Sequence, residues 1–403
     1  MNILLLSNIY PLPGPENQGT KVCHFFAKEW VSAGHNVRVI HYQATYPSLY
    51  YIIAKLFRNK IASKTGAIVY TKKEKSITHF TMDGVNVSRI PLQKKIPHGK
   101  FPINKLKDSV KKIIGFNKEN TFVPDIILGH FINPQLEVLN YLKKEYNHAR
   151  TGLIFHLPSE LIMAEKLYGK NLIPMLEQID ILGFRNEPLK RMFKKRYAIQ
   201  IKSFICYSGI PEEYIAKVNL HKFVGPLCRF LFVGGLIERK YPVQVLDALI
   251  DVYKTNSFTL DYVGDGQEKE IIKKRIIDNN LNLNVSLHGK INRDAILSLY
   301  DKSDCMIMIS REEAFGLVYL EAMARGCIVI ASRDEGMDGI IVDGYNGFLC
   351  KAGDSKELAR IIMKINTLSS EEKSIISNNA IKTACLLTDK KVANRYLNDV
   401  INE

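Results

Sequence analysis

The stretch Ser310-Arg-Glu-Glu-Ala-Phe-Gly-Leu-Val-Tyr-Leu-Glu-Ala-Met-Ala-Arg-Gly-Cys-Ile-Val-Ile-Ala-Ser332 predicts the end of a strand, a loop, a helix and a second strand. Residues 306–309 form a short apolar run, which is typical of a buried parallel strand. Residues 316–325 have helical composition and stop at Gly326, a residue that suits the position after a helix. Residues 327–331 are apolar and largely β-branched, so they predict the next parallel strand.

Two carboxylates flank the start of this predicted helix. Glu313 lies in the loop after the strand, and Glu321 lies about one turn inside the helix. Ligands of open α/β sheets bind at the carboxyl ends of the strands. The free N–H groups of Phe315, Gly316 and Leu317 suit a phosphate or a sugar oxygen there. The same spacing also fits an ordinary strand-helix-strand unit, in which acidic residues near the helix start are favoured by the helix dipole.

The first part of the chain predicts a Rossmann-like parallel sheet. Asn2–Ser7 reads as a strand, Lys21–Ala33 as an amphipathic helix and Asn36–His41 as a second strand. The connecting loop lacks Gly-x-Gly-x-x-Gly, so the fingerprint of nicotinamide dehydrogenases is absent. Further strands are expected at 125–128, 152–155 and 204–207.

A second alternating series begins at Arg229, and the 403 residues are long enough for two or three domains. Its expected strands are 230–233, 259–263 and 285–287, and its expected helices are 243–254, 268–279 and 293–301. A last helix is expected at Asp389–Asn402. We therefore expect two Rossmann-like domains joined near residues 208–228.

The pattern Glu313-x-Phe-Gly-x-x-x-x-Glu321-Ala-Met-Ala-x-Gly resembles the donor-site signature of retaining glycosyltransferases of family four. The resemblance implies the α/β fold called GT-B, with two facing Rossmann-like domains and a terminal helix that crosses back to the first. On this basis residues 1–207 form the acceptor-side domain together with residues 386–403, residues 208–228 the linker and residues 229–385 the donor domain. The resemblance covers nearly the whole chain, most specifically residues 230–350.

The resemblance also assigns roles to residues. Glu313 matches the glutamate that contacts hydroxyls of the donor sugar, and Glu321 matches the one that binds the ribose. Phe232–Lys240 resembles the segment whose arginine and lysine hold the donor diphosphate. Lys240 matches the lysine, but Gly235 stands where the arginine is expected. Arg239 is the alternative source of the second positive charge. A cation is needed because the departing nucleoside diphosphate gains negative charge. The alternative is that Lys240 and Arg239 are solvated surface side chains that take no part in binding.

Further loops resemble parts of the nucleotide pocket. Gly264 and Gly266 lie in a strand-to-helix turn like the one that shapes this pocket, although any tight turn of this kind favours glycine. Lys290 and Ile291 follow a strand in the segment whose backbone meets the base. Residues 335–348 stand where the family has two glycine-rich turns. We expect them to be structural and assign them no catalytic role.

In the first domain the resemblance marks His156 and Gly19. His156 matches the histidine beside the donor sugar, although a lone histidine at a strand end is more often structural. Gly19 belongs to the loop near the phosphates and the acceptor, and Arg185 is a candidate cation. The expected catalytic residues are thus Glu313, Lys240 and His156. The expected donor-binding residues are Glu321, Arg239, Gly235, Gly264, Gly266, Lys290, Ile291, Phe315, Gly316, Leu317 and Gly19.

The positive charge is concentrated in one segment. The net charge is +15, and residues 51–118 hold sixteen basic and three acidic residues. No nucleic-acid-binding signature accompanies this segment, so an anionic membrane surface is the expected partner. Asn104–Lys118 reads as an amphipathic helix, and Ser48–Ile61 is a second basic, apolar segment. Each could equally pack onto its domain and present a solvated lysine face.

These observations predict a retaining transfer of a sugar from a nucleotide-sugar to a lipid-linked or glycan acceptor in polysaccharide biosynthesis. A sugar phosphorylase of the same fold and a non-catalytic sugar- or nucleic-acid-binding module are the alternatives. No metal-ligand spacing is present, so we expect neither a catalytic metal nor a cofactor. The seven scattered cysteines indicate reduced core residues, and no signal peptide or membrane span is evident. We expect a cytoplasmic protein, peripheral on the inner face of the membrane.

Overall fold

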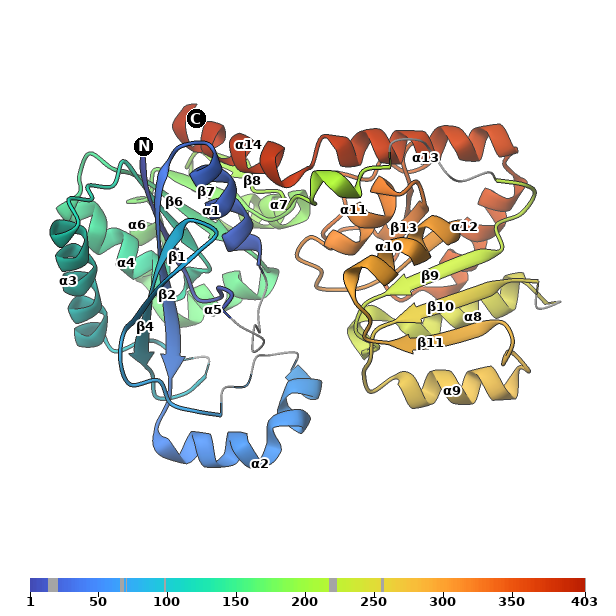
Figure 1. The fold of residues 1–403 in the computed structure, drawn as a ribbon, viewed down its shortest axis with the longest axis horizontal. Coiled ribbons are helices and arrows are strands. Elements are labelled where there is room, and N and C mark those ends of the chain that lie inside the picture. The colour runs from blue at the N-terminus through green and yellow to red at the C-terminus, as the bar shows by residue number, and fades with distance from the viewer. Residues whose placement is uncertain are drawn as a thin grey trace. The chain divides into compact units, whose positions relative to one another are not determined.

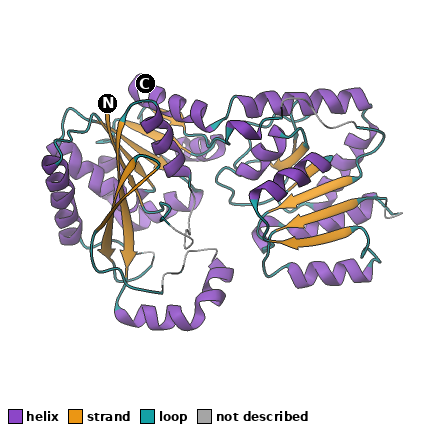
Figure 2. Cartoon of the chain, in the orientation of Figure 1, coloured by secondary structure: helices purple, strands orange, loops and turns teal. Residues whose placement is uncertain are grey.

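The chain forms two compact units, each built on its own sheet (Figure 1). The computed structural model describes residues 1–13, 21–65, 69, 71–97, 99–216, 223–254 and 257–402, and of residues 58–65 only the backbone. Unit 1 comprises Met1–Arg185, Leu189–Cys206 and Asp389–Glu403, and unit 2 comprises Asn186–Pro188 and Tyr207–Thr388. In both units strands alternate with helices along the chain (Figure 2).

The sheet of unit 1 has the strand order β3-β4-β2-β1-β5-β6-β7-β8, with all pairs parallel except β3 with β4. The buried run Ile3–Leu6 of the first strand lies near its centre, as expected for a strand covered on both faces. The strands are β1 (Asn2–Ser7), β2 (Asn36–Thr45), β3 (Thr78–Met82), β4 (Val85–Gln93), β5 (Ile126–His130), β6 (Arg150–Phe155), β7 (Ile181–Phe184) and β8 (Ser203–Ile205).

Helices of unit 1 follow most of these strands. They are α1 (Val22–Ser32), α2 (Ser48–Thr65), α3 (Ile103–Glu119), α4 (Ile132–Glu145), α5 (Pro158–Tyr168), α6 (Leu172–Leu176), α7 (Glu187–Arg196) and α14 (Asp389–Asn402), with a short 3-10 turn at Gly169–Asn171. The terminal helix α14 packs on α1: the indole N–H of Trp30 donates to the carbonyl of Ala393 at 2.9 Å, and the Tyr396 ring meets Phe26 edge-on. The expected return of the last helix to the first domain is confirmed.

Unit 2 contains a parallel sheet of order β11-β10-β9-β12-β13-β14. Its strands are β9 (Arg229–Val233), β10 (Thr259–Val263), β11 (Val285–Gly289), β12 (Cys305–Ile307), β13 (Ile328–Ser332) and β14 (Phe348–Cys350). Its helices are α8 (Pro242–Val252), α9 (Lys269–Asp278), α10 (Arg293–Lys302), α11 (Leu317–Ala324), α12 (Ser355–Thr367) and α13 (Ser370–Cys385), with 3-10 turns at Glu212–Tyr214 and Glu238–Lys240.

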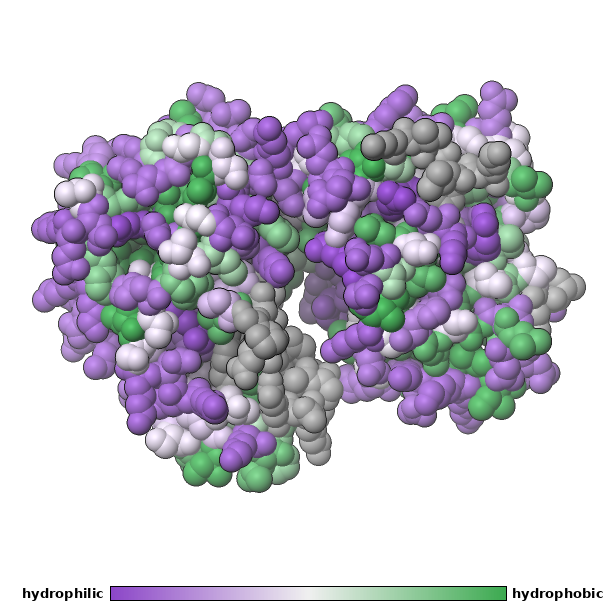
Figure 3. All heavy atoms as spheres, in the orientation of Figure 1, coloured by the Kyte–Doolittle hydropathy of each residue, from purple (hydrophilic) through white to green (hydrophobic). Residues whose placement is uncertain are grey.

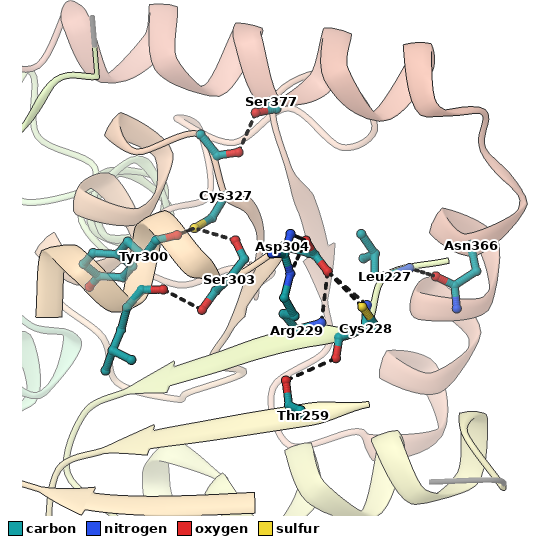
Figure 4. A network of polar contacts seen from close by, with 12 residues as sticks. Leu227, Cys228, Arg229, Thr259, Tyr300, Ser303, Asp304, Cys327, Asn366 and Ser377 are labelled. Carbon is teal, nitrogen blue, oxygen red and sulfur yellow. Dashed lines mark hydrogen bonds and ion pairs between the residues drawn. The ribbon is translucent and has the colours of Figure 1, made fainter. Parts of the chain in front are cut away.

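Asp304 ties the amino ends of two strands of unit 2 together (Figure 4). Its carboxylate accepts hydrogen bonds from the backbone N–H groups of Cys228 and Arg229, at 3.1 and 3.0 Å, and pairs with the Arg229 guanidinium. The buried Cys327 thiol donates to the carbonyl of Tyr300 at 3.1 Å in the same region. This network therefore lies at the edge of the sheet opposite the carboxyl ends of its strands.

Residues 46–118 contain α2 and the β3–β4 hairpin, which the sequence analysis did not assign, in addition to the expected α3. Asp83 and Gly84 both have positive φ, 49° and 76°, as a two-residue hairpin turn requires. This Asp-Gly signal lies between residues of strand composition, so the hairpin was readable from the sequence. Strands β7 and β14, of four and three residues, were not expected from the sequence.

Burial decides between the two alternatives left open for α3 and corrects the expectation for one cysteine. Leu106, Val110 and Ile113 of α3 are buried in unit 1, so its apolar face is not available to a membrane, whereas its lysines are exposed. Among the cysteines, Cys228 is exposed rather than a core residue, since it lies just before β9. In the part of the chain that is described, no helix is both long and apolar enough to span a membrane.

Candidate functional site

The predicted residues of unit 2 lie at the carboxyl ends of its strands. Lys240 follows β9, Gly264 follows β10, Lys290 follows β11 and Glu313 follows β12. These four strands are neighbours in the sheet, so their carboxyl ends form one edge. The loops at this edge make the candidate donor site.

Lys240 and Glu313 form an ion pair across this edge. The Lys240 Nζ atom lies 3.3 Å from Glu313 Oε2, and both side chains are mostly buried, with 15% and 16% of their surface exposed. Lys240 Nζ also lies 3.6 Å from the sulfur of Met308, just past β12. Glu313 Oε2 is buried and accepts no hydrogen bond of good geometry from the described protein groups. A buried carboxylate oxygen with this spare capacity is suited to a ligand hydroxyl.

Glu335, in the loop after β13, holds the backbone of Glu313. Its Oε2 atom accepts a hydrogen bond from the Glu313 N–H at 2.8 Å. Burial raises the pKa of Glu335, and the nearby Glu313 carboxylate adds to this. Gly336 packs against the backbone of Phe315, where a Cβ atom would lie 2.7 Å from it. Glu335 and Gly336, which belong to the segment 335–348 for which the sequence predicted only turns, therefore position the Glu313 loop.

Arg239 reaches the same loop from the other side. Its backbone carbonyl accepts from the N–H of Arg311 at 2.8 Å. Its guanidinium Nη1 approaches the carbonyls of Arg311 and Glu312 at 3.4 and 3.5 Å. Lys240 and Arg239 thus both lie beside the Glu313 loop, so neither is an isolated surface cation.

Glu321 is held by two residues of α10. Arg293 Nη2 donates to Glu321 Oε1 at 2.5 Å, and the Tyr300 hydroxyl donates to Oε2 at 3.3 Å. The Arg293 guanidinium also lies over the Tyr214 ring, 5.0 Å from its centre. Arg293, Tyr300 and Tyr214 were not singled out from the sequence, since no spacing links them to Glu321.

Two of the predicted glycines are required by close backbone contact. A Cβ atom on Gly264 would lie 1.9 Å from the carbonyl oxygen of Gly234, and one on Gly266 would lie 2.3 Å from that of Leu236. Gly264 also has a φ of 138°. Gly235 differs, because a Cβ atom there would meet nothing closer than 3.8 Å. The turn after β10 therefore presses directly on the loop after β9.

The remaining predicted residues of unit 2 border these loops. The Gly264 N–H donates to the carbonyl of Gly289 at 2.8 Å, which places Lys290 and Ile291 beside the glycine turn. Phe315 is buried, and Gly316 begins α11 with a φ of 85°. Leu317 is the first residue of that helix.

In unit 1, His156 follows β6 and is nearly buried, with 7% of its surface exposed. Its Nε2 atom lies 3.0 Å from Nδ1 of His130, and His130 Nε2 lies 3.2 Å from the hydroxyl of Tyr396 on α14. The Tyr396 hydroxyl and the two imidazole rings thus form one continuous chain of polar contacts from α14 to the end of β6. Burial lowers the pKa of both histidines, that of His130 to about 3.

The sequence also marked Arg185 and Gly19 in the first domain. Arg185 is buried and donates to the carbonyl of Cys206 at 2.7 Å, just past the end of β8. Its positive charge adds to the lowering of the pKa of His130 and His156. Gly19 lies outside the described residues. Within the described residues, no cluster of three or more His, Cys, Asp or Glu side chains is arranged to hold a metal ion.

Comparison with known proteins identifies the family. Residues 224–383 match the family model described as glycosyl transferases group 1, which spans the strands and loops of the candidate donor site. Residues 224–383, which lie in unit 2, therefore form a domain of this family. The chain is an enzyme of the retaining type that transfers a sugar from a nucleotide donor.

Individual relatives agree with this assignment. The chain is 27% identical over 289 residues to the uncharacterized glycosyltransferase MJ1178 of Methanocaldococcus jannaschii, covering 72% of this chain and 76% of the relative. It is 37% identical over 183 residues to N-acetyl-alpha-D-glucosaminyl L-malate synthase of Bacillus anthracis, covering 45% and 43%. The structure of Anabaena Alr3699/HepE in complex with UDP has a TM-score of 0.66 and 17% identity, with 98% of each chain covered. The GT-B fold expected from the sequence is confirmed.

Proposed function

We propose that unit 2 binds a nucleotide-sugar through the loops that follow β9 to β13. Glu321 accepts hydrogen bonds from the ribose hydroxyls, and Glu313 accepts one from a hydroxyl of the donor sugar. Lys240 and Arg239 face the diphosphate. The observation that carries this proposal is the pairing of Lys240 with Glu313, whose buried Oε2 atom retains spare hydrogen-bonding capacity. The UDP bound to Anabaena HepE makes a uridine nucleotide the first candidate.

In the proposed reaction the bond between the anomeric carbon and the leaving phosphate oxygen breaks. A new bond forms between this carbon and an acceptor oxygen on the same face. The acceptor proton passes to an oxygen of the leaving phosphate, so neither Glu313 nor Glu321 acts as a nucleophile. Lys240 stabilises the negative charge that develops on the diphosphate, and fixed groups of this kind require no reorganisation during the reaction.

We further propose that the acceptor lies at the inner surface of the cytoplasmic membrane, as a lipid-linked glycan in polysaccharide biosynthesis. Exposed apolar side chains on α2 support this: Leu49, Ile52, Ile53, Leu56 and Phe57 are between 46% and 71% exposed. All of them except Leu49 belong to the segment 51–118, which holds sixteen basic and three acidic residues. An apolar helix surface in a basic segment is suited to an anionic bilayer.

A thermal-shift screen against UDP-, GDP-, ADP- and dTDP-sugars tests the donor assignment. One nucleotide should raise the melting temperature of the wild type more than the others, and the Glu321→Ala variant should lose this shift. Absence of any shift with all four would contradict the donor site. An absorbance band of pyridoxal phosphate in the purified protein would instead favour the phosphorylase alternative.

A further inference from the structure

Unit 1 has a cavity of about 310 Å³ beside the carboxyl ends of β2 and β4. The end residues of these strands, Thr45 and Gln93, line it, and α3 forms another wall. Among the described residues, none of those assigned to the donor site lines this cavity. In open α/β sheets, the carboxyl ends of the strands are where ligands bind.

The cavity is lined by four lysines, Lys73, Lys75, Lys105 and Lys112. Two carboxylates also line it, Glu74 and Asp108. Glu74 is paired with the nearly buried Arg89 at 3.1 Å, so its charge is already compensated. The four ammonium groups therefore outweigh the remaining carboxylate. Lysine ammonium groups bind phosphates as point charges, which suits a group with several anionic oxygens.

The apolar surface of α2 begins next to this cavity. The chain leaves β2 at Thr45, which lines the cavity, and α2 starts at Ser48. The Thr45 carbonyl accepts from the Lys94 N–H at 2.9 Å, and the N–H of Tyr46 donates to the Tyr51 hydroxyl at 3.1 Å. These bonds fix the start of α2 to the end of the sheet. Hydrophobic side chains gather over α2, at the lower edge of unit 1 in Figure 3, with hydrophilic ones beside them.

We propose that this lysine-lined cavity binds the phosphate or diphosphate group of a membrane amphiphile, with its lipid part directed toward the bilayer at α2. The inference rests on the proposed membrane-surface acceptor and specifies its chemistry: a glycan carried on a lipid phosphate. The same chemistry is offered by anionic phospholipid headgroups. Two observations carry it, the lysines around the cavity and the adjoining apolar helix.

Two double variants on one helix provide the test. Lys105→Gln/Lys112→Gln removes two cavity lysines, and Lys107→Gln/Lys111→Gln removes two exposed lysines of α3 that do not line the cavity. Both pairs change the net charge by the same amount. Calorimetry on the full chain with saturating UDP would measure binding of inorganic pyrophosphate and of geranyl diphosphate. Saturating UDP keeps these probes out of the proposed donor site.

We expect the cavity pair to lose about tenfold in affinity for both probes, and the control pair to lose less than about twofold. Equal losses in the two pairs would overturn the proposal, since a general positive field would then explain binding. No binding of either probe to the wild type would overturn it as well. Thermal unfolding of both pairs checks that the fold is intact.

Vesicle flotation distinguishes whether the cavity binds the phosphate of a lipid-linked acceptor or that of a phospholipid headgroup. Neutral phosphatidylcholine vesicles doped with a polyprenyl diphosphate should bind the wild type but not the cavity pair, whereas phosphatidylglycerol vesicles should bind both. A cavity pair that loses only phosphatidylglycerol binding would assign the cavity to phospholipid headgroups and overturn the acceptor assignment. UDP affinity of the cavity pair should equal that of the wild type. A failure of this inference is thus distinguishable from a failure of the donor site.

Discussion

The Lys240 Nζ atom lies 3.3 Å from Glu313 Oε2, although the two residues are 73 positions apart and follow different strands. This pairing brings the expected diphosphate cation beside the expected sugar-binding carboxylate. Each side chain orients the other, and the backbone N–H of Glu313 is fixed separately by Glu335. The proposed donor site is therefore held in place by contacts within unit 2 itself, and contacts of this kind reduce the cost of ordering a site.

The two glutamates should have separable roles. Glu321→Ala should weaken the binding of free UDP by roughly 1.5–3 kcal/mol, through loss of charge-assisted hydrogen bonds to ribose. Glu313→Ala should impair transfer while leaving free nucleotide binding nearly intact. Calorimetry with UDP, together with transfer rates, distinguishes them. Equal loss of UDP affinity in both variants would contradict this division.

Lys240→Ala should lower turnover by on the order of 10²–10³, the scale for one lost electrostatic donor. The exposed Lys302, the last residue of α10, provides a control, because Lys302→Ala removes the same charge just before the start of β12, at the opposite edge of the sheet. Initial rates at saturating donor measure the effect. The assignment fails if Lys240→Ala keeps more than half of the wild-type rate. EDTA should leave the wild type active, and strict metal dependence would refute the expectation of a metal-independent reaction.

Two neighbouring glycines should respond differently to a methyl group. Gly264→Ala should destabilise the protein strongly, because the new Cβ atom would lie 1.9 Å from the Gly234 carbonyl and the φ of 138° disfavours alanine. Gly235→Ala should leave the melting temperature nearly unchanged, since no atom lies within 3.8 Å of its Cβ position. Any effect of Gly235→Ala on UDP affinity would then report on the site and not on the fold. Similar melting temperatures for both variants would refute the steric argument.

Glu160 should make stability depend on pH. Burial raises its folded-state pKa from 4.5 to about 7, although backbone N–H groups of His156 and Ile132 bond its carboxylate. Between pH 4.5 and about 7 the native state retains a proton that the unfolded chain has released. Glu160 therefore lowers the free energy of unfolding as the pH rises through this window.

A Glu160→Gln variant cannot ionise, so it should lack this contribution, at most about 3 kcal/mol across the window. The measurement is the free energy of unfolding in urea at several pH values between 4.5 and 7. The difference between the two proteins isolates Glu160, because all other titrating groups are shared. A constant difference across the window would contradict the raised pKa.

Membrane binding should depend on the apolar residues of α2. Ile52→Ser/Leu56→Ser should reduce flotation with anionic vesicles, because it removes side chains that are 59% and 71% exposed. Ile271→Ser/Ile277→Ser on α9 provides a matched control, with residues 48% and 64% exposed in unit 2. Wild-type binding should need anionic lipid and weaken, without vanishing, in high salt. Equal flotation of both variants would remove α2 from the interface.

The sequence determined the alternation of strands and helices and the positions of the donor-site loops. Because carboxyl ends of neighbouring parallel strands share one edge, residues such as Lys240 and Glu313 could be placed together from their positions after β9 and β12. The glycines of the turn after β10 were readable for a similar reason, since a tight approach of two backbones demands them there.

Only the tertiary structure decided which side chains complete the site and which faces remain exposed. Arg293 and Tyr300 hold Glu321, and Tyr396 reaches His130, because the fold joins residues that no local pattern connects. The helices α2 and α3 are both basic and apolar, yet α3 buries its apolar residues in unit 1 while α2 exposes them. An amphipathic pattern specifies that a face is apolar, but its partner is chosen by packing.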